Sequence, residues 1–270
     1  MKFRLGLVTG ATSGIGMGVC ERLAREGIPF LATGRDLVQL QALQQKLQSQ
    51  VNVQILAVDL AEPTGRASLI RWIHHEAPDL VINNAGFGLY GEALSYTTEE
   101  QSKILTVNGQ ATLEITLEAA RTLITKHQPG VVLNISSAAG FQSLAYSAVY
   151  AASKAFINSF SQALDFELKP SGVRVLTLCP GMVDTDFQRR AGGKRQEKEK
   201  GVMTVEFVVE EMWQQIQRGQ SLRIINWIYR WITYFSYFIP NSMIAVFSKK
   251  VLSARILPRN FITIDTTHDN

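Results

Sequence analysis

A tyrosine and a lysine stand four residues apart in the stretch YAASK, as Tyr150 and Lys154, and this pair could move protons. In a helix, residues four apart lie one above the other on the same face. A free tyrosine, with a pKa of about 10, is a poor acid at neutral pH, but a nearby ammonium group favours its phenolate. The spacing therefore predicts that Tyr150 acts as general acid toward a carbonyl oxygen, or as base toward an alcohol.

Two adjacent serines, Ser136 and Ser137, follow an apolar run at 131–135. If that run is a strand, they stand at the carboxyl end of a parallel sheet, which is where ligands bind in open α/β folds. A serine hydroxyl there can donate a hydrogen bond to the substrate oxygen and stabilise developing negative charge. Position alone leaves both serines open as this donor.

The segment TGATSGIG at 9–16 follows the first apolar run and leads into the first helical pattern. Its glycines let the backbone approach a diphosphate closely, and a helix N-terminus offers free N–H groups. The spacing GxxxGxG differs from the GxGxxG of the common dinucleotide fingerprint. We expect a phosphate-binding turn in which the contacts come from Gly10, Ser13, Gly14, Ile15 and Gly16.

The residues after the second apolar run, at 29–33, bear on the choice of dinucleotide. A carboxylate at this strand end binds the ribose hydroxyls of NAD, whereas a guanidinium accepts the 2′-phosphate of NADP. Gly34 takes the expected acidic position and Arg35 follows it, so we predict NADPH as the cofactor. Asp36, one residue further, keeps NAD open as the alternative.

A parallel sheet would bring these groups together. Six nearly continuous apolar runs are typical of strands covered on both faces, at 3–8, 29–33, 53–58, 80–83, 131–135 and 173–178. Helical patterns separate or follow them, at 15–26, 37–50, 65–76, 99–126, 150–169 and 204–218, and a last strand is expected at 222–226. Thr98 and Gln101 predict a capping box for the fourth helix. The alternation predicts an α/β fold with a Rossmann-like doubly wound parallel sheet.

Jointly, these motifs closely resemble those of the short-chain dehydrogenase/reductase family. The shared motifs are TGATSGIG at 9–16, Asp59, NNAG at 83–86, Asn108, Ser137, Tyr150 with Lys154, and PG at 180–181, so the resemblance covers about residues 3–186. It implies Ser137 as the hydrogen-bond donor, because the family's serine usually lies thirteen residues before the tyrosine. The implied catalytic set is Asn108, Ser137, Tyr150 and Lys154. In this set Asn108 kinks its helix and holds a water that links Lys154 to solvent.

The resemblance also implies the cofactor contacts. Asp59 would contact the adenine, Asn84 the ribose, and Val183 with Thr185 the nicotinamide carboxamide. The complete implied set is Gly10, Ser13, Gly14, Ile15, Gly16, Arg35, Asp59, Leu60, Asn84, Ala85, Gly86, Tyr150, Lys154, Pro180, Gly181, Val183 and Thr185. The implied reaction is hydride transfer between NADPH and a carbonyl or alcohol carbon.

The residues expected to wall the substrate pocket are almost all apolar. They are Phe87, Leu89, Phe141, Leu144, Met182 and Phe187, so we expect a hydrophobic ketone or aldehyde. Two alternatives stay open. One is an NAD-dependent alcohol dehydrogenase, and the other is a non-catalytic NADPH-binding regulator or membrane-recruited scaffold.

The end of the chain departs from the family's usual pattern, so we divide it into a domain at 1–226 and an aromatic-rich C-terminal extension at 227–270. The uncharged run 231–248 approaches membrane-spanning length, but Pro240 splits it. Trp and Tyr beside Lys and Arg are typical of segments that lie in a membrane interface. We expect peripheral membrane association; a lid over the pocket and a subunit interface are the alternatives.

Composition and residue pattern limit the domain size, the location and the metal content expected of this protein. With 270 residues and 46% hydrophobic content, the chain can bury one substantial core. The N-terminal apolar stretch stops at Thr9, too early for a signal peptide, so we expect a cytoplasmic protein. Cys20, Cys179 and the four histidines make no metal-binding pattern, so we expect no metal.

The net charge of +4 is unevenly distributed, with 13 Lys/Arg against 5 Asp/Glu in residues 187–260. Such an excess favours anionic partners. The basic residues form no recognisable nucleic-acid motif, so we do not expect nucleic acid as a partner. By analogy with the family, we expect a homodimer or homotetramer paired through the helices that carry Asn108 and Tyr150.

Overall fold

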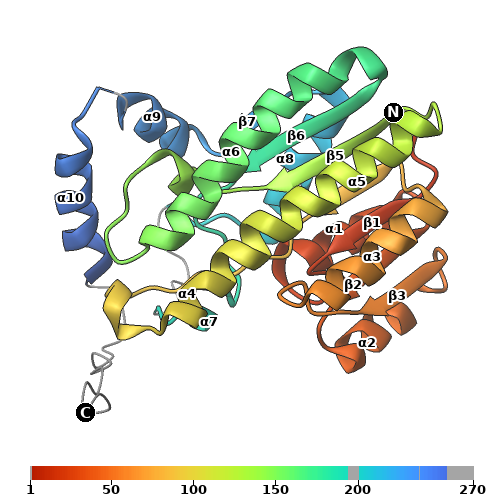
Figure 1. Cartoon of the computed structure of the whole chain (residues 1–270), viewed down its shortest axis with the longest axis horizontal. Helices are drawn as coiled ribbons and strands as arrows, with labels where there is room; N and C mark the ends of the chain where they lie inside the picture. Colours follow the sequence, from red (N-terminus) through yellow and green to blue (C-terminus); the bar gives the residue numbers. More distant parts are fainter. Residues whose placement is uncertain (1, 194–200, 237, 254–270) are drawn as a thin grey trace, which may run out of the picture.

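The computed structural model describes residues 2–193, 201–236 and 238–253, and at its centre lies one seven-stranded sheet (Figure 1). The strand order is β3-β2-β1-β4-β5-β6-β7, and every neighbouring pair is parallel. The strands are β1 (Gly6–Thr9), β2 (Phe30–Gly34), β3 (Val53–Ala57), β4 (Leu80–Asn83), β5 (Gly130–Ile135), β6 (Val173–Cys179) and β7 (Leu222–Ile224). The predicted Rossmann-like parallel sheet is confirmed.

Helices cover both faces of this sheet. One face packs against α1 (Gly14–Arg25), α2 (Leu37–Leu47) and α8 (Val205–Arg218). The other packs against α3 (Pro63–Glu76), α5 (Thr112–Thr125) and α6 (Ala148–Leu168). The middle strands are consequently buried on both sides, and side chains such as Leu7, Val8 and Val132 expose no surface. This double covering explains why their sequences are apolar without alternation.

The first strand is shorter than the sequence indicates. Phe3 and Leu5 are buried, but β1 begins only at Gly6. The backbone N–H groups of Arg4 and Leu5 donate instead to the Asp79 carboxylate, at 2.9–3.1 Å. A side chain therefore takes the hydrogen bonds that a neighbouring strand would otherwise supply.

The capping box predicted for the fourth helix is shifted by one residue. α4 (Thr98–Ile104) is capped by Thr97, whose hydroxyl accepts from Glu100 N at 3.1 Å. The Glu100 carboxylate in turn accepts from Thr97 N at 2.8 Å. The prediction with Thr98 and Gln101 is therefore wrong, because Thr98 already has helical geometry and lies inside the first turn.

A π-helical segment, η2 (Leu105–Ala111), joins α4 to α5. The expected helix at 99–126 is therefore one continuous rod with a widened turn in its middle, and Asn108 lies in that turn. Widened turns of this kind are often found at functional sites. The predicted irregularity at Asn108 is present.

Two helices follow the last strand: α9 (Trp227–Ser236) and α10 (Asn241–Ser253). Figure 1 shows them together at one end of the molecule, beyond the carboxyl ends of β5 and β6. The start of α9 coincides with the proposed division at 226/227. The division itself stays a prediction, and residues 254–270 lie outside the described residues.

Candidate active site

A cavity of about 620 Å³ opens at the carboxyl edge of the sheet. Ligand pockets usually enclose about 300–1,000 Å³, so this one has room for an extended small molecule. Its walls include most of the predicted cofactor residues: Gly10, Ser13, Gly14, Ile15, Arg35, Asp59, Leu60, Asn84, Ala85, Gly86, Tyr150, Lys154, Pro180, Gly181, Val183 and Thr185. They also include Ser137, Phe87, Leu144, Met182 and Phe187.

Four predicted site residues do not lie on the cavity wall: Gly16, Leu89, Asn108 and Phe141. Gly16 packs inward, and a Cβ there would lie 2.1 Å from the carbonyl oxygen of Gly10. Asn108 is fully buried behind the wall. Phe141 ends the short helix η3 (Ala138–Phe141), which packs against α9, and it contributes nothing to the lining. Contact of Gly16, Leu89 and Phe141 with a ligand in this cavity is therefore not supported.

The glycine turn forms the floor at one end of the cavity. Gly10 and Gly14 have φ angles of +64° and +54°, a left-handed region that residues with a Cβ avoid. Ser13 is the N-cap of α1, but its hydroxyl makes no capping bond. The first N–H groups of α1 therefore have no side-chain cap, which suits them to bind an anion.

Asn84 holds this turn in place. Its side-chain amide donates to the carbonyl oxygens of Thr9 and Gly10, each at 3.0 Å. The Thr9 hydroxyl accepts from the backbone N–H groups of Asn84 and Ala85, at 3.0 and 2.9 Å. The ends of β1 and β4 are thereby tied together, so Asn84 shapes the cradle besides lining the cavity.

The second strand end presents an arginine to the cavity. Arg35 lines it, whereas its neighbour Asp36 does not. The Asp36 carboxylate is used as the N-cap of α2 and accepts from Gln39 N at 3.1 Å and from Gln39 Nε2 at 2.9 Å. The carboxylate that kept NAD open is therefore already bonded within the protein.

The two candidate serines have different surroundings. Ser136 is buried, and its hydroxyl donates to the carbonyl oxygen of Lys154 at 3.0 Å. Ser137 is half-buried. Its hydroxyl accepts from Ala139 N at 3.1 Å, donates over a long 3.5 Å to the carbonyl oxygen of Pro180, and forms a hydrogen bond with Tyr150. Of the two serines, Ser137 has the longer donor bond and contacts the tyrosine.

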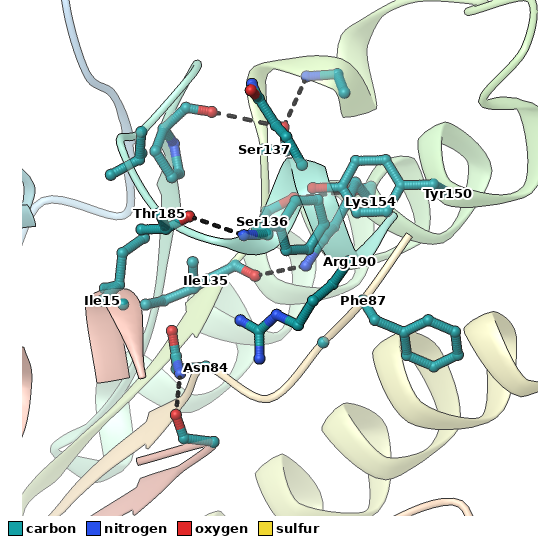
Figure 2. Close-up of a pocket in the computed structure, with 18 of the residues that line it drawn as sticks. Ile15, Asn84, Phe87, Ile135, Ser136, Ser137, Tyr150, Lys154, Thr185 and Arg190 are labelled. Atoms are coloured by element: carbon teal, nitrogen blue, oxygen red, sulfur yellow. Dashed lines mark hydrogen bonds between the residues drawn. The ribbon is translucent and has the colours of Figure 1, made fainter. Parts of the chain in front are cut away.

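Tyr150 and Lys154 lie on one face of α6, next to Ser137, as Figure 2 shows. Lys154 Nζ is 5.7 Å from the centre of the Tyr150 ring and donates to the carbonyl oxygen of Ile135 at 2.9 Å. Both side chains are buried, at 8% and 5% exposure. The pair predicted from spacing alone is thus brought together.

Burial sets the protonation of this pair. It raises the pKa of Tyr150 above its ordinary value, an effect that the hydrogen bond with Ser137 opposes. Burial also lowers the pKa of Lys154 to about 8. The expected lowering of the Tyr150 pKa by Lys154 is not found in the protein by itself, because burial is the main influence on this phenol and raises its pKa. Tyr150 is protonated at neutral pH.

Asn108 acts on the site through the backbone. Its side chain accepts from Phe87 N at 3.0 Å and donates to the Phe87 carbonyl at 2.9 Å and to Ser153 Oγ at 3.1 Å. The Ser153 hydroxyl donates to the carbonyl oxygen of Tyr150 at 2.7 Å. Asn108 thereby links the loop after β4 to the helix that carries the tyrosine.

Several cavity residues were not found from the sequence. Arg190, on the short helix α7 (Phe187–Arg190), reaches back to the glycine turn, where its Nη2 donates to Ser13 Oγ at 3.2 Å. Figure 2 shows its side chain lying between Lys154 and Asn84. No spacing rule links residue 190 to residue 13, so only the folded chain reveals this cation.

The C-terminal helices also line the cavity. The contributing residues are Tyr229, Ile232 and Thr233 from α9, and Phe247, Ser248, Val251 and Leu252 from α10. The Tyr229 hydroxyl accepts from Met182 N at 3.2 Å, and Ser248 Oγ accepts from Ala145 N at 3.0 Å. Both helices are therefore bonded to the loops around the site.

Metal-binding clusters and membrane-spanning helices are both absent from the residues that the structure describes. No three of their His, Cys, Asp and Glu side chains group closely enough to hold a metal ion. None of the helices in that part of the chain has the length and apolar character needed to cross a bilayer.

Comparisons with known proteins agree with this geometry. The model of the short chain dehydrogenase family matches residues 5–196. An uncharacterised oxidoreductase of Myxococcus xanthus is 37% identical over 190 residues, which cover 69% of this chain and 75% of the relative.

Solved structures share the whole fold. A short-chain dehydrogenase from Sphingobium yanoikuyae in complex with NADPH is 29% identical, has a TM-score of 0.80, and matches 97% of this chain and 99% of its own. The bulky-bulky ketone specific alcohol dehydrogenase of Comamonas testosteroni is 23% identical with a TM-score of 0.76, covering 100% of this chain and 98% of that one, a likeness in fold. The matched residues contain the glycine turn, Ser137, Tyr150 and Lys154. This chain therefore belongs to the short-chain dehydrogenase family and is an oxidoreductase that acts on CH–OH groups with NAD(P).

Proposed function

We propose that this protein is an NADPH-dependent reductase of hydrophobic ketones or aldehydes, which also catalyses the reverse oxidation of the alcohol. The observation that carries the proposal is the layout of the cavity. Ser137, Tyr150 and Lys154 lie together, and the glycine turn and Arg35 line the same cavity. Binding and reacting groups thus share one space of suitable volume.

The residues divide the work of carbonyl reduction. Reduced nicotinamide, when bound, supplies the hydride to the carbonyl carbon. Tyr150, protonated at neutral pH, donates its proton to the carbonyl oxygen as that hydride arrives. The Ser137 hydroxyl donates a hydrogen bond to the same oxygen and stabilises its developing charge. Lys154, protonated below a pH of about 8, stabilises the phenolate left on Tyr150.

NADPH rather than NADH is supported by the second strand end. Arg35 faces the cavity, while Asp36 is occupied in capping α2. The guanidinium of Arg35 matches the geometry of a ribose 2′-phosphate. The structural relative from Sphingobium yanoikuyae, solved with NADPH, is consistent with this choice. The free N–H groups of α1 would hold the diphosphate.

The substrate proposed is mainly apolar but carries a second polar group. Phe87, Met182 and Phe187 give the cavity apolar walls. The buried hydroxyls of Ser147 and Thr233 also line it, and neither has a hydrogen-bond partner among the described residues. An unpaired buried hydroxyl costs about 1–3 kcal/mol, so a substrate group that pairs with them gains affinity.

The test is NADPH oxidation by the purified protein with a panel of fatty, steroid-like and acyl-carrier ketones. Tyr150→Phe should reduce turnover by about 10²- to 10⁴-fold, because the proton donor is lost. Arg35→Ala should weaken NADPH binding about 10-fold or more and leave NADH binding unchanged. Full turnover by Tyr150→Phe would reject the mechanism.

Each alternative has its own outcome. Tighter binding of NADH than NADPH in the wild-type protein would favour an NAD-dependent alcohol dehydrogenase. A chain that binds NADPH but reduces no carbonyl compound would favour a cofactor-binding regulator or scaffold.

We also propose a cytoplasmic homodimer or homotetramer that attaches peripherally to membranes through its C-terminal segment. The exposed Phe156 and Phe166 of α6 support subunit pairing through that helix. Exposed aromatic side chains on α9 and α10 support membrane attachment. Light scattering tests the subunit number, and co-sedimentation with vesicles, with and without residues 224–257, tests attachment.

A further inference from the structure

A second pocket, of about 380 Å³, contains three arginines from three consecutive elements. Arg218 ends α8, Arg223 lies in β7, and Arg230 lies in α9. Gln220 and Tyr234 add polar groups to the same wall. The pocket lies apart from the catalytic cavity, with which it shares no lining residue.

Among the described residues, no carboxylate pairs with two of the three arginines in this pocket. Arg223 is paired, since its Nε and Nη2 donate to Glu211 Oε2 at 3.0 and 2.7 Å. Within the part of the chain that the structure describes, neither Arg218 nor Arg230 forms an ion pair. Arg230 donates only to the Ile224 carbonyl, at 3.3 Å. Guanidinium groups gathered in this way suit a phosphate, which can accept from several of them at once.

An apolar surface adjoins the pocket on the same helix. α9 carries Arg230 and Tyr234 to the pocket and exposes Trp227, Trp231 and Phe235 by 68%, 55% and 60%. Trp231 and Phe235 stack on each other, with ring centres 5.7 Å apart. α10 adds Met243, Val246 and Phe247, each more than half exposed. Contiguous apolar surface of this kind usually marks a binding face.

The charge around this face selects its partner. Between Glu211 and Asp265 the sequence has no acidic residue, whereas residues 212–264 contain seven Lys or Arg. A second copy would present the same positive charge and be repelled, while an anionic bilayer attracts it. Trp and Tyr beside basic residues are the composition of helices that lie in the membrane interface.

We propose that the Arg218–Arg223–Arg230 pocket binds the headgroup phosphate of an anionic phospholipid while the outer faces of α9 and α10 enter the bilayer interface. This inference rests on the peripheral attachment proposed above and gives it a lipid class and a site. The inner faces of the same helices line the catalytic cavity through Tyr229 and Leu252. A lipophilic substrate can therefore pass from the bilayer into the cavity beside these helices.

The test uses the full chain and vesicles of phosphatidylcholine, with or without phosphatidylglycerol. Co-sedimentation should require phosphatidylglycerol. The double variant Arg218→Gln/Arg230→Gln should bind about 30-fold more weakly, from about 1 kcal/mol for each basic residue near the surface. Arg71→Gln, on α3 and bonded only to Ser68, is the matched control and should bind like the wild type.

A second pair of variants tests the apolar face. Trp231→Ala/Phe235→Ala should lose binding to the same vesicles, whereas Phe207→Ala, an exposed phenylalanine on α8, should not. NADPH oxidation with a soluble ketone should be unchanged in all of these variants, because none of these side chains lines the catalytic cavity.

The outcomes separate the proposals. Equal binding to both kinds of vesicle, or binding unaffected by the arginine double variant, overturns the headgroup site but leaves attachment standing. No binding to either vesicle overturns both. Dissociation of an oligomer by Trp231→Ala/Phe235→Ala would assign the face to a second copy and also overturn the inference. Inorganic phosphate that binds at the arginines without any vesicle binding would assign the pocket to a free anion instead.

Discussion

Replacing the buried lysine by methionine should make the protein more stable while it abolishes activity. Lys154 is 5% exposed and burial lowers its pKa from 10.5 to about 8, so at neutral pH folding must keep an ammonium group in a poorly solvated place. Methionine has nearly the same length and no charge. The change removes the ionisation cost together with one hydrogen bond, to the carbonyl oxygen of Ile135.

The size of the effect follows from the difference between the two pKa values. A difference of about 2.5 units corresponds to about 3 kcal/mol at neutral pH. Loss of the hydrogen bond to Ile135 destabilises the variant by about 1 kcal/mol. The net expectation is that Lys154→Met raises the free energy of unfolding by about 2 kcal/mol. Between a pH of about 8 and 10.5 the unfolded chain binds more protons at Lys154 than the folded chain does. Wild-type stability relative to the variant therefore rises with pH in that window, and the cost is fully present below it.

Urea denaturation near pH 7 and near pH 9 measures this directly. The stability difference between Lys154→Met and the wild type should shrink by about 1.4 kcal/mol between the two pH values, because the wild-type lysine loses its excess proton cost. Lys126→Met, at an exposed lysine near the end of α5, shows what the same replacement does away from the site. A stability difference that stays constant between the two pH values would refute the argument that burial of the Lys154 ammonium destabilises the folded protein.

Three further predictions concern the cofactor, the glycine turn and a buried ion pair. Arg190→Ala should weaken NADPH and NADH binding alike, each about 10-fold in a fluorescence titration, because this guanidinium lies at the diphosphate end of the cavity. Gly16→Ala should cost about 1–3 kcal/mol or more in urea denaturation, since its Cβ would lie 2.1 Å from Gly10 O, and it should disturb dinucleotide binding. Asp165→Asn should destabilise the fold by about 3 kcal/mol near pH 7, because it breaks the ion pair of this buried carboxylate and leaves the partly buried Arg174 unpaired. Burial raises the pKa of the Asp165 carboxyl, but its hydrogen bonds outweigh this effect, so the net pKa is lowered. The stability difference between the wild type and Asp165→Asn should therefore shrink as the pH falls below the range in which a free carboxylate ionises.

Residues whose relative positions depend only on one helix or one strand–helix turn were predicted well from the sequence. The spacing of Tyr150 and Lys154 needs only one helix, and the glycine turn needs only one strand followed by one helix. The sheet itself was visible as apolar runs, because strands covered on both faces contain few polar residues. Errors appeared where a side chain replaces a regular hydrogen bond. Asp79 ends β1 early, and Thr97 rather than Thr98 caps α4.

Groups that depend on distant packing could not be predicted. Arg190 meets Ser13 across 177 residues of sequence, and α10 reaches the cavity by a hydrogen bond from Ala145 to Ser248. The direction of the Tyr150 pKa shift was also missed, since spacing reveals the neighbouring lysine but not the burial that raises the pKa. Contact and desolvation are properties of the folded chain, and no residue pattern states them.

Lys154 differs from the other cations that lie deep in this fold. Arg66 pairs with Glu114 at 2.9 Å, and Arg174 pairs with Asp165 at 2.8 Å. Among the described residues, no carboxylate pairs with Lys154, which donates its hydrogen bond to the backbone carbonyl of Ile135. A carboxylate there would stabilise the ammonium, but it would also compete with the phenolate of Tyr150 for that charge and repel an anionic cofactor. The unpaired, buried ammonium of Lys154 therefore destabilises the folded protein, but the proposed proton transfer requires it.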